Sequence, residues 1–267
     1  MRKSRPVALI GAGQLSRSFV TKLPGLPGQL GPVIAPSFRL ASRLVNSIRA
    51  GHPAQKYEDL HGCRSVLIAV PEALLPEVVS RMAAAGMEWR RKVVLLCDSP
   101  LDSSELAPLA ARGANTGSLT PMHGFAQRFV VEGHREAVKE ARRLIHDPQA
   151  RLFEIQRARK GLYLAALSFA TGLFTPLADA ALQCLRAAGL SRAAAESVAE
   201  DLFHKTLRAY LHAGRKAWSG PLAVQRELEA LEDLERPLAQ YYRACVAAAF
   251  QRFAAPRRSG RTPDSLH

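Results

Sequence analysis

Aromatic residues are scarce in this sequence, and long apolar runs are missing from it. Only 6% of its 267 residues are aromatic, and no apolar run reaches the roughly 18 residues that suggest a membrane-spanning helix. The charged N-terminus is followed by too few apolar residues for a signal peptide. We therefore expect a cytoplasmic protein that does not contact a membrane.

Disulfide partners and metal ligands are scarce too. The four cysteines lie far apart and form no Cys-x-x-Cys pair, which favours buried, reduced thiols over a disulfide framework. They are Cys63, Cys97, Cys184 and Cys245. His204 and His212 have the spacing of one helix face but no third ligand, so no metal site is predicted.

Acidic residues are outnumbered, with 23 Asp and Glu against 37 Lys and Arg and a formal net charge of +14. Such a charge attracts phosphates of every kind. The basic residues are nevertheless dispersed, and the sequence has no helix-turn-helix, zinc-finger or RNA-binding motif. Nucleic acid is therefore the weakest of the partners considered. The length favours two domains.

The chain is organised around residues 6–20, where a short apolar run leads through Gly-x-Gly into a segment with helical spacing. Gly11 permits a sharp turn, and Gly13 leaves the backbone open to a pyrophosphate at the helix N-terminus. Ser16 replaces the third glycine of the dinucleotide fingerprint, and its small side chain still permits close packing. The predicted pyrophosphate site comprises Gly11, Gly13, Gln14 and Leu15. The alternative is a purely structural turn.

Residues 31–36 predict a second strand, and no Asp or Glu follows it to accept hydrogen bonds from the ribose of NAD. Ser37 and Arg39 follow instead, with Arg43 one turn later. Together they predict a site for the 2′-phosphate of NADP, formed through charge-assisted hydrogen bonds. The alternative is that both arginines are solvated helix residues.

Strand-like and helical segments then alternate, which predicts an α/β class with a Rossmann-type parallel sheet. Strands are expected at 65–71, 92–97 and 128–133, and helices at 74–82 and 103–112. Ligands bind at the carboxyl ends of such strands. We therefore place Val70, Pro71 and Ser99 at the cofactor, together with Asp98, which could instead cap the following helix.

Beyond residue 153 the sequence becomes helical throughout, which predicts an all-α C-terminal domain. Helices are expected at 157–188, 191–216, 222–234 and 236–254, with Gly189 ending the first and Ser191 capping the second. The predicted domains are 1–153 for NADP(H) binding and 154–255 for substrate binding and dimerisation. Residues 256–267 are expected to be disordered.

Five segments carry a resemblance that spans nearly all of the chain: 11–16, 68–71, 117–126, 160–163 and 219–221. The residues of these segments and the order in which they occur resemble those of the bacterial Rossmann-like proteins with a C-terminal domain of unknown function, DUF2520. It is also similar in architecture to pyrroline-5-carboxylate reductase and the 6-phosphogluconate dehydrogenase-like superfamily. The resemblance implies an NADP(H)-binding domain, a helical domain that forms a homodimer, and a substrate cleft between the domains.

The resemblance also implies site residues and departures from the family pattern. Lys160 is the first candidate for donating a proton or for polarising the substrate, as a lysine on this helix does in the wider superfamily. By their positions alone, Tyr163 one turn along the same helix and His123 in a loop after a strand are further candidates. Their alternatives are a solvated lysine, a core tyrosine and an incidental histidine. The pattern has histidine at the positions of Thr120 and Leu164, and asparagine near Gly172. After Gly220 and Pro221 it has Arg and Asp, where this chain has Val224 and Arg226.

Two functions within this fold follow. The first is an NADP(H)-dependent oxidoreductase that reduces a small carbonyl or imine. The second is an NADP(H)-binding sensor or scaffold with weakened catalysis, which the departures at Leu164 and Gly172 favour because neither residue can move a proton.

Overall fold

The structure is a computed structural model that describes residues 6–11, 13–145, 147–221 and 223–254. Its contacts divide the chain into two compact units, Met1–Leu167 and Ser168–His267, which are described separately. We call them the sheet unit and the helical unit. The segment 256–267, predicted to be disordered, lies outside the described residues.

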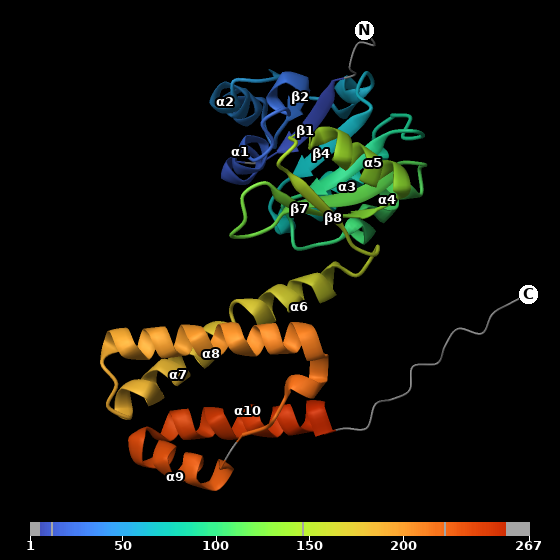
Figure 1. Ribbon diagram of the computed structural model, residues 1–267. Coiled ribbons are helices and arrows are strands. Elements are labelled where there is room, and N and C mark those ends of the chain that lie inside the picture. The colour runs from blue at the N-terminus through green and yellow to red at the C-terminus, as the bar shows by residue number, and fades with distance from the viewer. Residues whose placement is uncertain (1–5, 12, 146, 222, 255–267) are drawn as a thin grey trace, which may run out of the picture. The chain divides into compact units, whose positions relative to one another are not determined.

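The sheet unit is built on one sheet whose described strands run in the order β3-β2-β1-β4-β5-β6-β7-β8 (Figure 1). The strands are β1 (Val7–Gly11), β2 (Leu30–Ile34), β3 (His52–Pro53), β4 (Ser65–Ala69), β5 (Val93–Cys97), β6 (Asn115–Pro121), β7 (Arg128–Gly133) and β8 (Arg151–Glu154). Strands β1 to β6 are parallel. The order reverses between β1 and β4, where doubly wound sheets bind their ligands. The predicted α/β class with a Rossmann-type sheet is confirmed.

The far side of the sheet departs from the all-parallel prediction. Strand β7 runs antiparallel to β6, and β8 is parallel to β7. Only residues 122–127 separate β6 from β7, which is enough for a hairpin but too short for the crossover that a parallel pair requires. Strand β8 was missed because it is brief and begins and ends on a charged residue.

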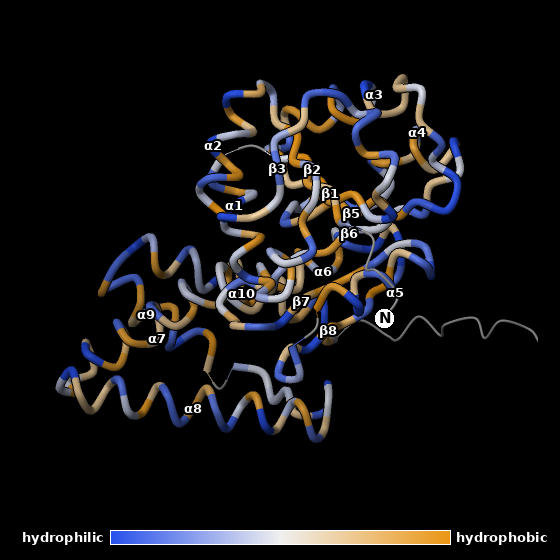
Figure 2. The backbone as a smooth tube through the Cα atoms, turned by 90° about the horizontal axis from the view of Figure 1, so that it is seen from above, coloured by the Kyte–Doolittle hydropathy of each residue, from blue (hydrophilic) through white to orange (hydrophobic). Residues whose placement is uncertain are grey.

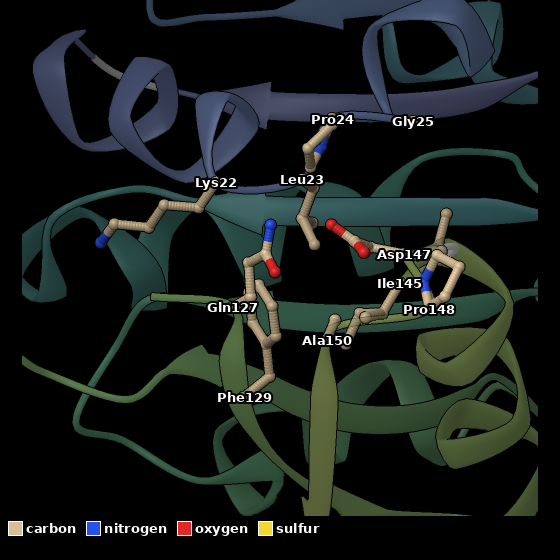
Figure 3. A pocket seen from close by; sticks show the side chains of 11 residues that line it. Lys22, Leu23, Pro24, Gly25, Gln127, Phe129, Ile145, Asp147, Pro148 and Ala150 are labelled. Atoms are coloured by element: carbon tan, nitrogen blue, oxygen red, sulfur yellow. The ribbon is translucent and has the colours of Figure 1, made fainter. Parts of the chain in front are cut away.

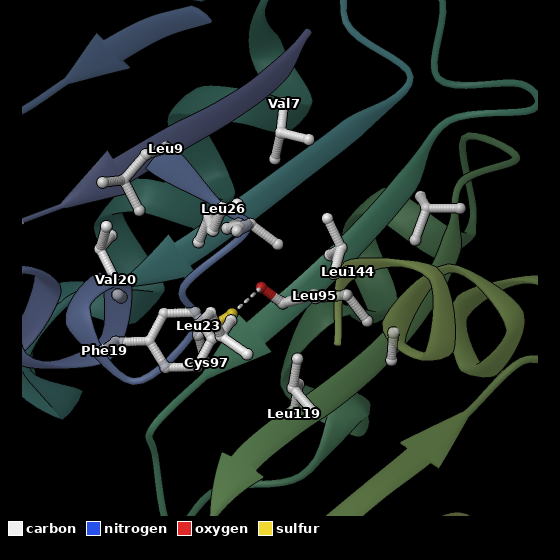
Figure 4. Close-up of a cluster of buried hydrophobic side chains, with 14 of the residues drawn as sticks. Val7, Leu9, Phe19, Val20, Leu23, Leu26, Leu95, Cys97, Leu119 and Leu144 are labelled. Atoms are coloured by element: carbon white, nitrogen blue, oxygen red, sulfur yellow. Dashed lines mark hydrogen bonds between the residues drawn. The ribbon is translucent and has the colours of Figure 1, made fainter. Parts of the chain in front are cut away.

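Helices cover both faces of the sheet. One face carries α1 (Gly13–Thr21), α2 (Phe38–Ile48) and α5 (Arg135–Leu144), and the other carries α3 (Leu75–Ala84) and the single-turn α4 (Ala107–Ala110). Figure 4 shows the first of the two cores, to which α1 contributes Phe19 and Val20 and β5 contributes Leu95 and Cys97. Helix α5 was not predicted, and the expected helix 103–112 is a short 3-10 helix (Ser103–Leu106) followed by α4.

The helical part begins with α6 (Lys160–Ala170), whose first residues belong to the sheet unit. It continues with α7 (Phe174–Ala187), α8 (Arg192–Ala213), α9 (Val224–Leu234) and α10 (Arg236–Ala254). The prediction of one helix over 157–188 is wrong, since a turn at 171–173 separates α6 from α7. Two predicted boundaries are confirmed: Gly189 follows α7 with a φ of +98°, and the Ser191 side chain caps α8 by accepting from Ala194 N.

The thiols and the apolar segments differ in part from expectation. All four cysteines are free, but Cys184 and Cys245 are only half-buried. Residues 160–187 contain an 18-residue window of mean hydropathy 1.4, enough to span a membrane by length and composition. One such segment is weak evidence for a span, and the turn at 171–173 interrupts it. The expectation that no segment reaches this length is nevertheless wrong.

Candidate functional site

The turn from β1 to α1 is packed so tightly that only glycine fits at its first position. A Cβ atom at Gly11 would lie 2.5 Å from Ser16 Oγ and 3.0 Å from Leu44 Cδ2. Ser16 is fully buried, and its hydroxyl donates to the carbonyl oxygen of Ala69 at the end of β4, at 2.6 Å. The serine therefore allows close contact between helix and sheet and adds a hydrogen bond that a glycine could not make.

The second glycine of the turn leaves open space. Gly13 has a φ of +62°, and an added Cβ would meet nothing within 4 Å. Helix α1 starts at Gly13, and its first turn holds no acidic side chain. Gln14 is exposed and Leu15 half-buried beside it. Free backbone N–H groups and a positive helix end beside open space form the usual environment of a bound anion.

The polar groups after β2 lie at the N-terminus of α2. Ser37 caps this helix, because its Oγ accepts a hydrogen bond from Leu40 N at 3.3 Å, which leaves its own hydroxyl hydrogen to donate. Arg39 and Arg43 are both exposed, and the structure gives neither an acidic partner among the residues it describes. The phosphate role predicted for Ser37 and Arg39 stays a prediction.

The ends of β4 and β5 lie at the same edge of the sheet as the β1–α1 turn. Val70 is buried and Pro71 exposed after β4. After β5, Asp98 adopts a φ of +49° and pairs with Lys22 at 3.4 Å. The alternative role of Asp98 as a helix cap is wrong, since Asp102 caps the following 3-10 helix instead. Left-handed backbone at a non-glycine residue is uncommon and often marks a functional site.

Ser99 is buried beside Asp98, with a relative exposure of 4%. Its Oγ accepts from Leu101 N at 3.1 Å, and its carbonyl oxygen accepts from Thr120 Oγ1 at 3.3 Å. Ser99 therefore fixes the loop after β5 to the end of β6. This is a structural function, and it is compatible with the predicted place near a cofactor.

Lys160, the first residue of α6, is one of two fully buried charged residues of the site, with Glu132. It is 1% exposed, so the alternative of a solvated lysine is wrong. Its Nζ donates to Leu101 O at 2.9 Å, to Thr120 Oγ1 at 2.8 Å and to Ser118 Oγ at 3.3 Å. The three hydrogens of the ammonium therefore each have an acceptor.

The surroundings of Lys160 hold it close to the point of losing its proton. Burial lowers the pKa of Lys160 to about 8, and the charge of Glu132 acts in the opposite direction. Glu132 is itself buried and accepts from the backbone N and the hydroxyl of Ser103, both at 2.8 Å. An amine with a pKa of about 8 is protonated at neutral pH and can still give up its proton.

The other two catalytic candidates are not brought to the Lys160 ammonium. Tyr163 lies one turn along α6, is half-buried, and has its pKa raised by burial. His123 is exposed in the β6–β7 hairpin loop. The three hydrogen bonds of Lys160 include neither residue. Their proposed roles depend on a substrate that reaches them separately.

Sequence reasoning missed the side chains that hold Lys160. Ser118 and Thr120 alternate along β6, so both side chains point to one face of the sheet, opposite to the buried Leu119. Two hydroxyl residues flanking a leucine were a visible signal. Thr120 stands where the family pattern has histidine, and here its hydroxyl accepts from Lys160.

Cavities lie in both units of the part of the chain that the structure describes. One of them has a volume of about 190 Å³ and lies in the sheet unit; Figure 3 shows that Leu23 and Phe129 line it with apolar side chains and Asp147 with a carboxylate. A second, of about 370 Å³, lies beside Arg64 and Arg91. The third is an apolar groove of about 1130 Å³ in the helical unit. Among the described residues no cluster of His, Cys, Asp and Glu could hold a metal.

Comparisons with known proteins agree with this architecture. Residues 127–249 match the model of a domain of unknown function, DUF2520, so the match begins within the sheet unit. The resemblance inferred from the sequence is confirmed. No curated protein sequence matches the chain.

Several solved structures share the fold at low identity. An imine reductase from Myxococcus stipitatus, in complex with NAD+, is 14% identical with a TM-score of 0.65, and the match covers 94% of this chain and 92% of that one. The Streptomyces aurantiacus imine reductase is 16% identical, with a TM-score of 0.62 and coverages of 93% and 94%. A pyrroline-5-carboxylate reductase from Coxiella burnetii is 14% identical, with a TM-score of 0.53 and coverages of 94% and 98%.

Proposed function

We propose that this chain, a Rossmann-like protein with a DUF2520 domain, binds a nicotinamide dinucleotide and reduces a small carbonyl or imine compound. The observation that carries the proposal is the open space at Gly13, beside the first N–H groups of α1 and at the point where the strand order reverses. The likeness to imine reductases and to a pyrroline-5-carboxylate reductase supports the choice of reaction.

The residues present fit such a cofactor. Gly11, Gly13, Gln14 and Leu15 would hold the pyrophosphate, because their backbone N–H groups lie at the positive end of α1. Ser37 and Arg39 would bind the 2′-phosphate, so NADP(H) is the proposed form. Val70, Pro71 and Ser99 would line the path of the cofactor along the strand ends. The bound cofactor would supply a hydride.

Lys160 would supply the proton. Its ammonium is buried at the sheet edge where the strands end, and burial lowers its pKa to about 8. The substrate's nitrogen or oxygen would replace one of the present acceptors, of which Ser118 Oγ is the most distant at 3.3 Å. Tyr163 and His123 would orient the substrate.

One observation favours the second function, a nucleotide-binding sensor or scaffold. All three hydrogens of the Lys160 ammonium already have acceptors within the sheet unit. Such a lysine can simply hold α6 to the sheet. Oxidation of NADPH with a panel of cyclic imines and keto acids separates the two functions, because a sensor binds the nucleotide without turnover.

Thermal unfolding with NADPH, with NADH and with neither tests nucleotide binding directly. A ligand present at about 100 times its Kd and bound only to the folded state stabilises it by about 2.7 kcal/mol. We expect NADPH to raise Tm more than NADH does. In the Arg39→Ala variant the NADPH effect should fall toward the NADH effect, because one charged partner of the 2′-phosphate is lost.

Arg112→Ala is the matched control, since Arg112 is also exposed but precedes β6, at the opposite edge of the sheet from Arg39. It should leave both nucleotide effects unchanged. An equal loss for NADPH and NADH in Arg39→Ala would refute the phosphate assignment. No shift with either nucleotide in the unaltered protein would refute cofactor binding.

We also propose that two copies of the chain associate through their helical units. In the described part of this unit few large apolar side chains are fully buried, while many are exposed, including Leu202, Leu207 and Leu211 on α8. Figure 2 shows apolar and polar residues alternating along this helix. An apolar surface of this extent marks an interaction site. The groove also has charged lining residues, Glu196 and Glu200, which a lipid core would not accept.

The expected solution mass is therefore twice 29.1 kDa by light scattering. Leu211→Lys should shift the protein toward monomer, because Leu211 is 74% exposed and a lysine cannot be buried against a second copy without a partner. Ala230→Lys places the same charge on the exposed face of α9 and should leave the dimer intact. A monomeric unaltered protein, or one that binds phosphatidylcholine vesicles instead, would contradict the proposal.

A further inference from the structure

Two arginines occupy directly neighbouring positions on the last two strands of the sheet. Arg128 of β7 is the register partner of Arg151 of β8. Adjacent strands lie about 4.8 Å apart, so two positive side chains on one face are close enough to repel each other. Both residues are exposed. A pair of this kind costs stability unless a negative charge is shared between the two guanidinium groups.

The alternation of side chains places this pair on the same sheet face as the Lys160 network. Phe129 and Leu152, the residues after the two arginines, both pack toward the core beneath α1 and α5. Arg128 and Arg151 therefore project from the opposite face. Thr120, which accepts from Lys160, is the register partner of Val130, two residues along β7 from Arg128.

The Arg128 side chain is held in place. Its guanidinium carbon lies 4.7 Å from the centre of the Phe125 ring, in the hairpin loop that also carries His123. The backbone closes this loop, since Met122 N donates to Arg128 O at 2.8 Å. A guanidinium stacked on an aromatic ring keeps its N–H edge free for a ligand and loses less freedom on binding.

No carboxylate of the described chain neutralises the pair. The acidic side chains nearest in sequence to Arg128 and Arg151 are Glu132 and Glu154. Glu132 accepts hydrogen bonds from Ser103, and Glu154 forms an ion pair with Arg142 at 2.7 Å. Neither Arg128 nor Arg151 belongs to any ion pair that the structure describes. The two positive charges are therefore unmatched among the described residues of the sheet unit.

The pair is too far along the sheet to bind the phosphates of the proposed cofactor. Strands β4, β5 and β6 separate β1 from β7, a distance of about 19 Å at the usual strand spacing. We infer that Arg128 and Arg151 bind the carboxylate of the substrate, whose reducible carbon then lies toward Lys160. The substrate class is a carbonyl or imine compound that also carries a carboxylate. This inference rests on the proposed function.

Benzoate and benzamide probe the pair, because they share a shape and differ in charge. In the full-length protein with saturating NADPH, 10 mM benzoate is expected to raise Tm and 10 mM benzamide to leave it unchanged, both at equal ionic strength, about 0.15 M, set with NaCl. Arg128→Gln and Arg151→Gln should each weaken the apparent benzoate affinity ten-fold or more. Arg112→Gln should not. A benzoate effect that survives both substitutions overturns the inference.

The variants also report on the pair without any ligand. Because the two arginines repel each other, Arg151→Gln should leave Tm the same or higher at low salt, whereas Arg128→Gln also loses the contact with the Phe125 ring. A loss of stability in Arg151→Gln would mean that this arginine serves the fold and would overturn the inference. Inorganic phosphate forms a further arm: stabilisation stronger than that by benzoate, and equally dependent on both arginines, would overturn the assignment to a carboxylate.

Failure of the inference and failure of the proposed function give different results. If the protein does not bind a nucleotide, NADPH leaves Tm unchanged while benzoate can still act through the arginines. If the inference alone is wrong, NADPH stabilises all variants equally and benzoate acts on none of them, or on all of them alike.

Discussion

Lys160→Met is expected to lower the rate of NADPH oxidation, measured as kcat with the best substrate of an imine and keto-acid panel, by about 10² to 10⁴. Methionine has a similar length and fills the buried space, but it has no proton to give. For the unaltered protein kcat should fall as the pH rises above about 8, where Lys160 loses its proton. That decline should be absent from any residual activity of the variant.

A stability measurement tests the same group without a substrate. The pKa of Lys160 is about 8 in the folded protein against 10.5 for a free lysine, so between these values the unfolded chain binds more protons. The contribution of Lys160 to the free energy of unfolding therefore rises with pH across this window and is lowest below pH 8. A change of 2.5 pKa units would correspond to roughly 3 kcal/mol as an upper limit.

The measurement is the urea unfolding free energy of the unaltered protein minus that of Lys160→Met, at pH 7.5 and pH 10. The difference should rise with pH in favour of the unaltered protein. A constant difference would mean that Lys160 keeps its ordinary pKa and would remove the electrostatic basis for its role as the acid. A pH-independent kcat would lead to the same conclusion by a separate route.

Gly11→Ala is expected to destabilise the protein by about 1 to 3 kcal/mol and to abolish the effect of NADPH on Tm. The added methyl would lie 2.5 Å from Ser16 Oγ and 2.9 Å from Ser16 Cβ, both in a buried, well-packed position. Helix α1 would have to move away from β1 and β4. The N–H groups at its start would move with it.

Gly13→Ala is the matched comparison, because its methyl meets nothing within 4 Å and only the φ of +62° opposes it. Its expected cost is about 1 to 2 kcal/mol, from left-handed backbone alone. Adding Ser16→Gly should restore part of the stability of Gly11→Ala, since it removes the group that the methyl strikes, and should not help Gly13→Ala. Equal responses of the two variants would refute this account of the turn.

The parts of the fold that were predictable are those set by neighbours in sequence. Runs of apolar residues determine the β1–α1 turn and the strands 65–71 and 92–97. Gly189 determines where α7 ends, and Ser191 determines where α8 begins. All of these signals act locally. The turn at 171–173 was missed because leucine and alanine on both sides favour one continuous helix, although Gly172 lay within it.

The candidate site was less predictable because long-range contacts create it. Lys160 stands in a run of charged residues, which indicates solvent, yet it is buried because β6 and the loop after β5 bring Ser118, Thr120 and Leu101 to its Nζ. The antiparallel β7 likewise decides which face Arg128 occupies. The contacts of Lys160 could not be inferred from spacing along the chain. The antiparallel β6–β7 pair could have been, because only residues 122–127 separate the two strands.

The start of α6 decides where this protein can be divided. Lys160 and the seven residues after it belong to the sheet unit, and the lysine is fixed to the sheet by three hydrogen bonds. A chimera joined at residue 154 would take this lysine from one parent and its acceptors from the other. A junction placed after Leu167 keeps donor and acceptors from a single parent, so exchanges of the helical part between relatives should be made there.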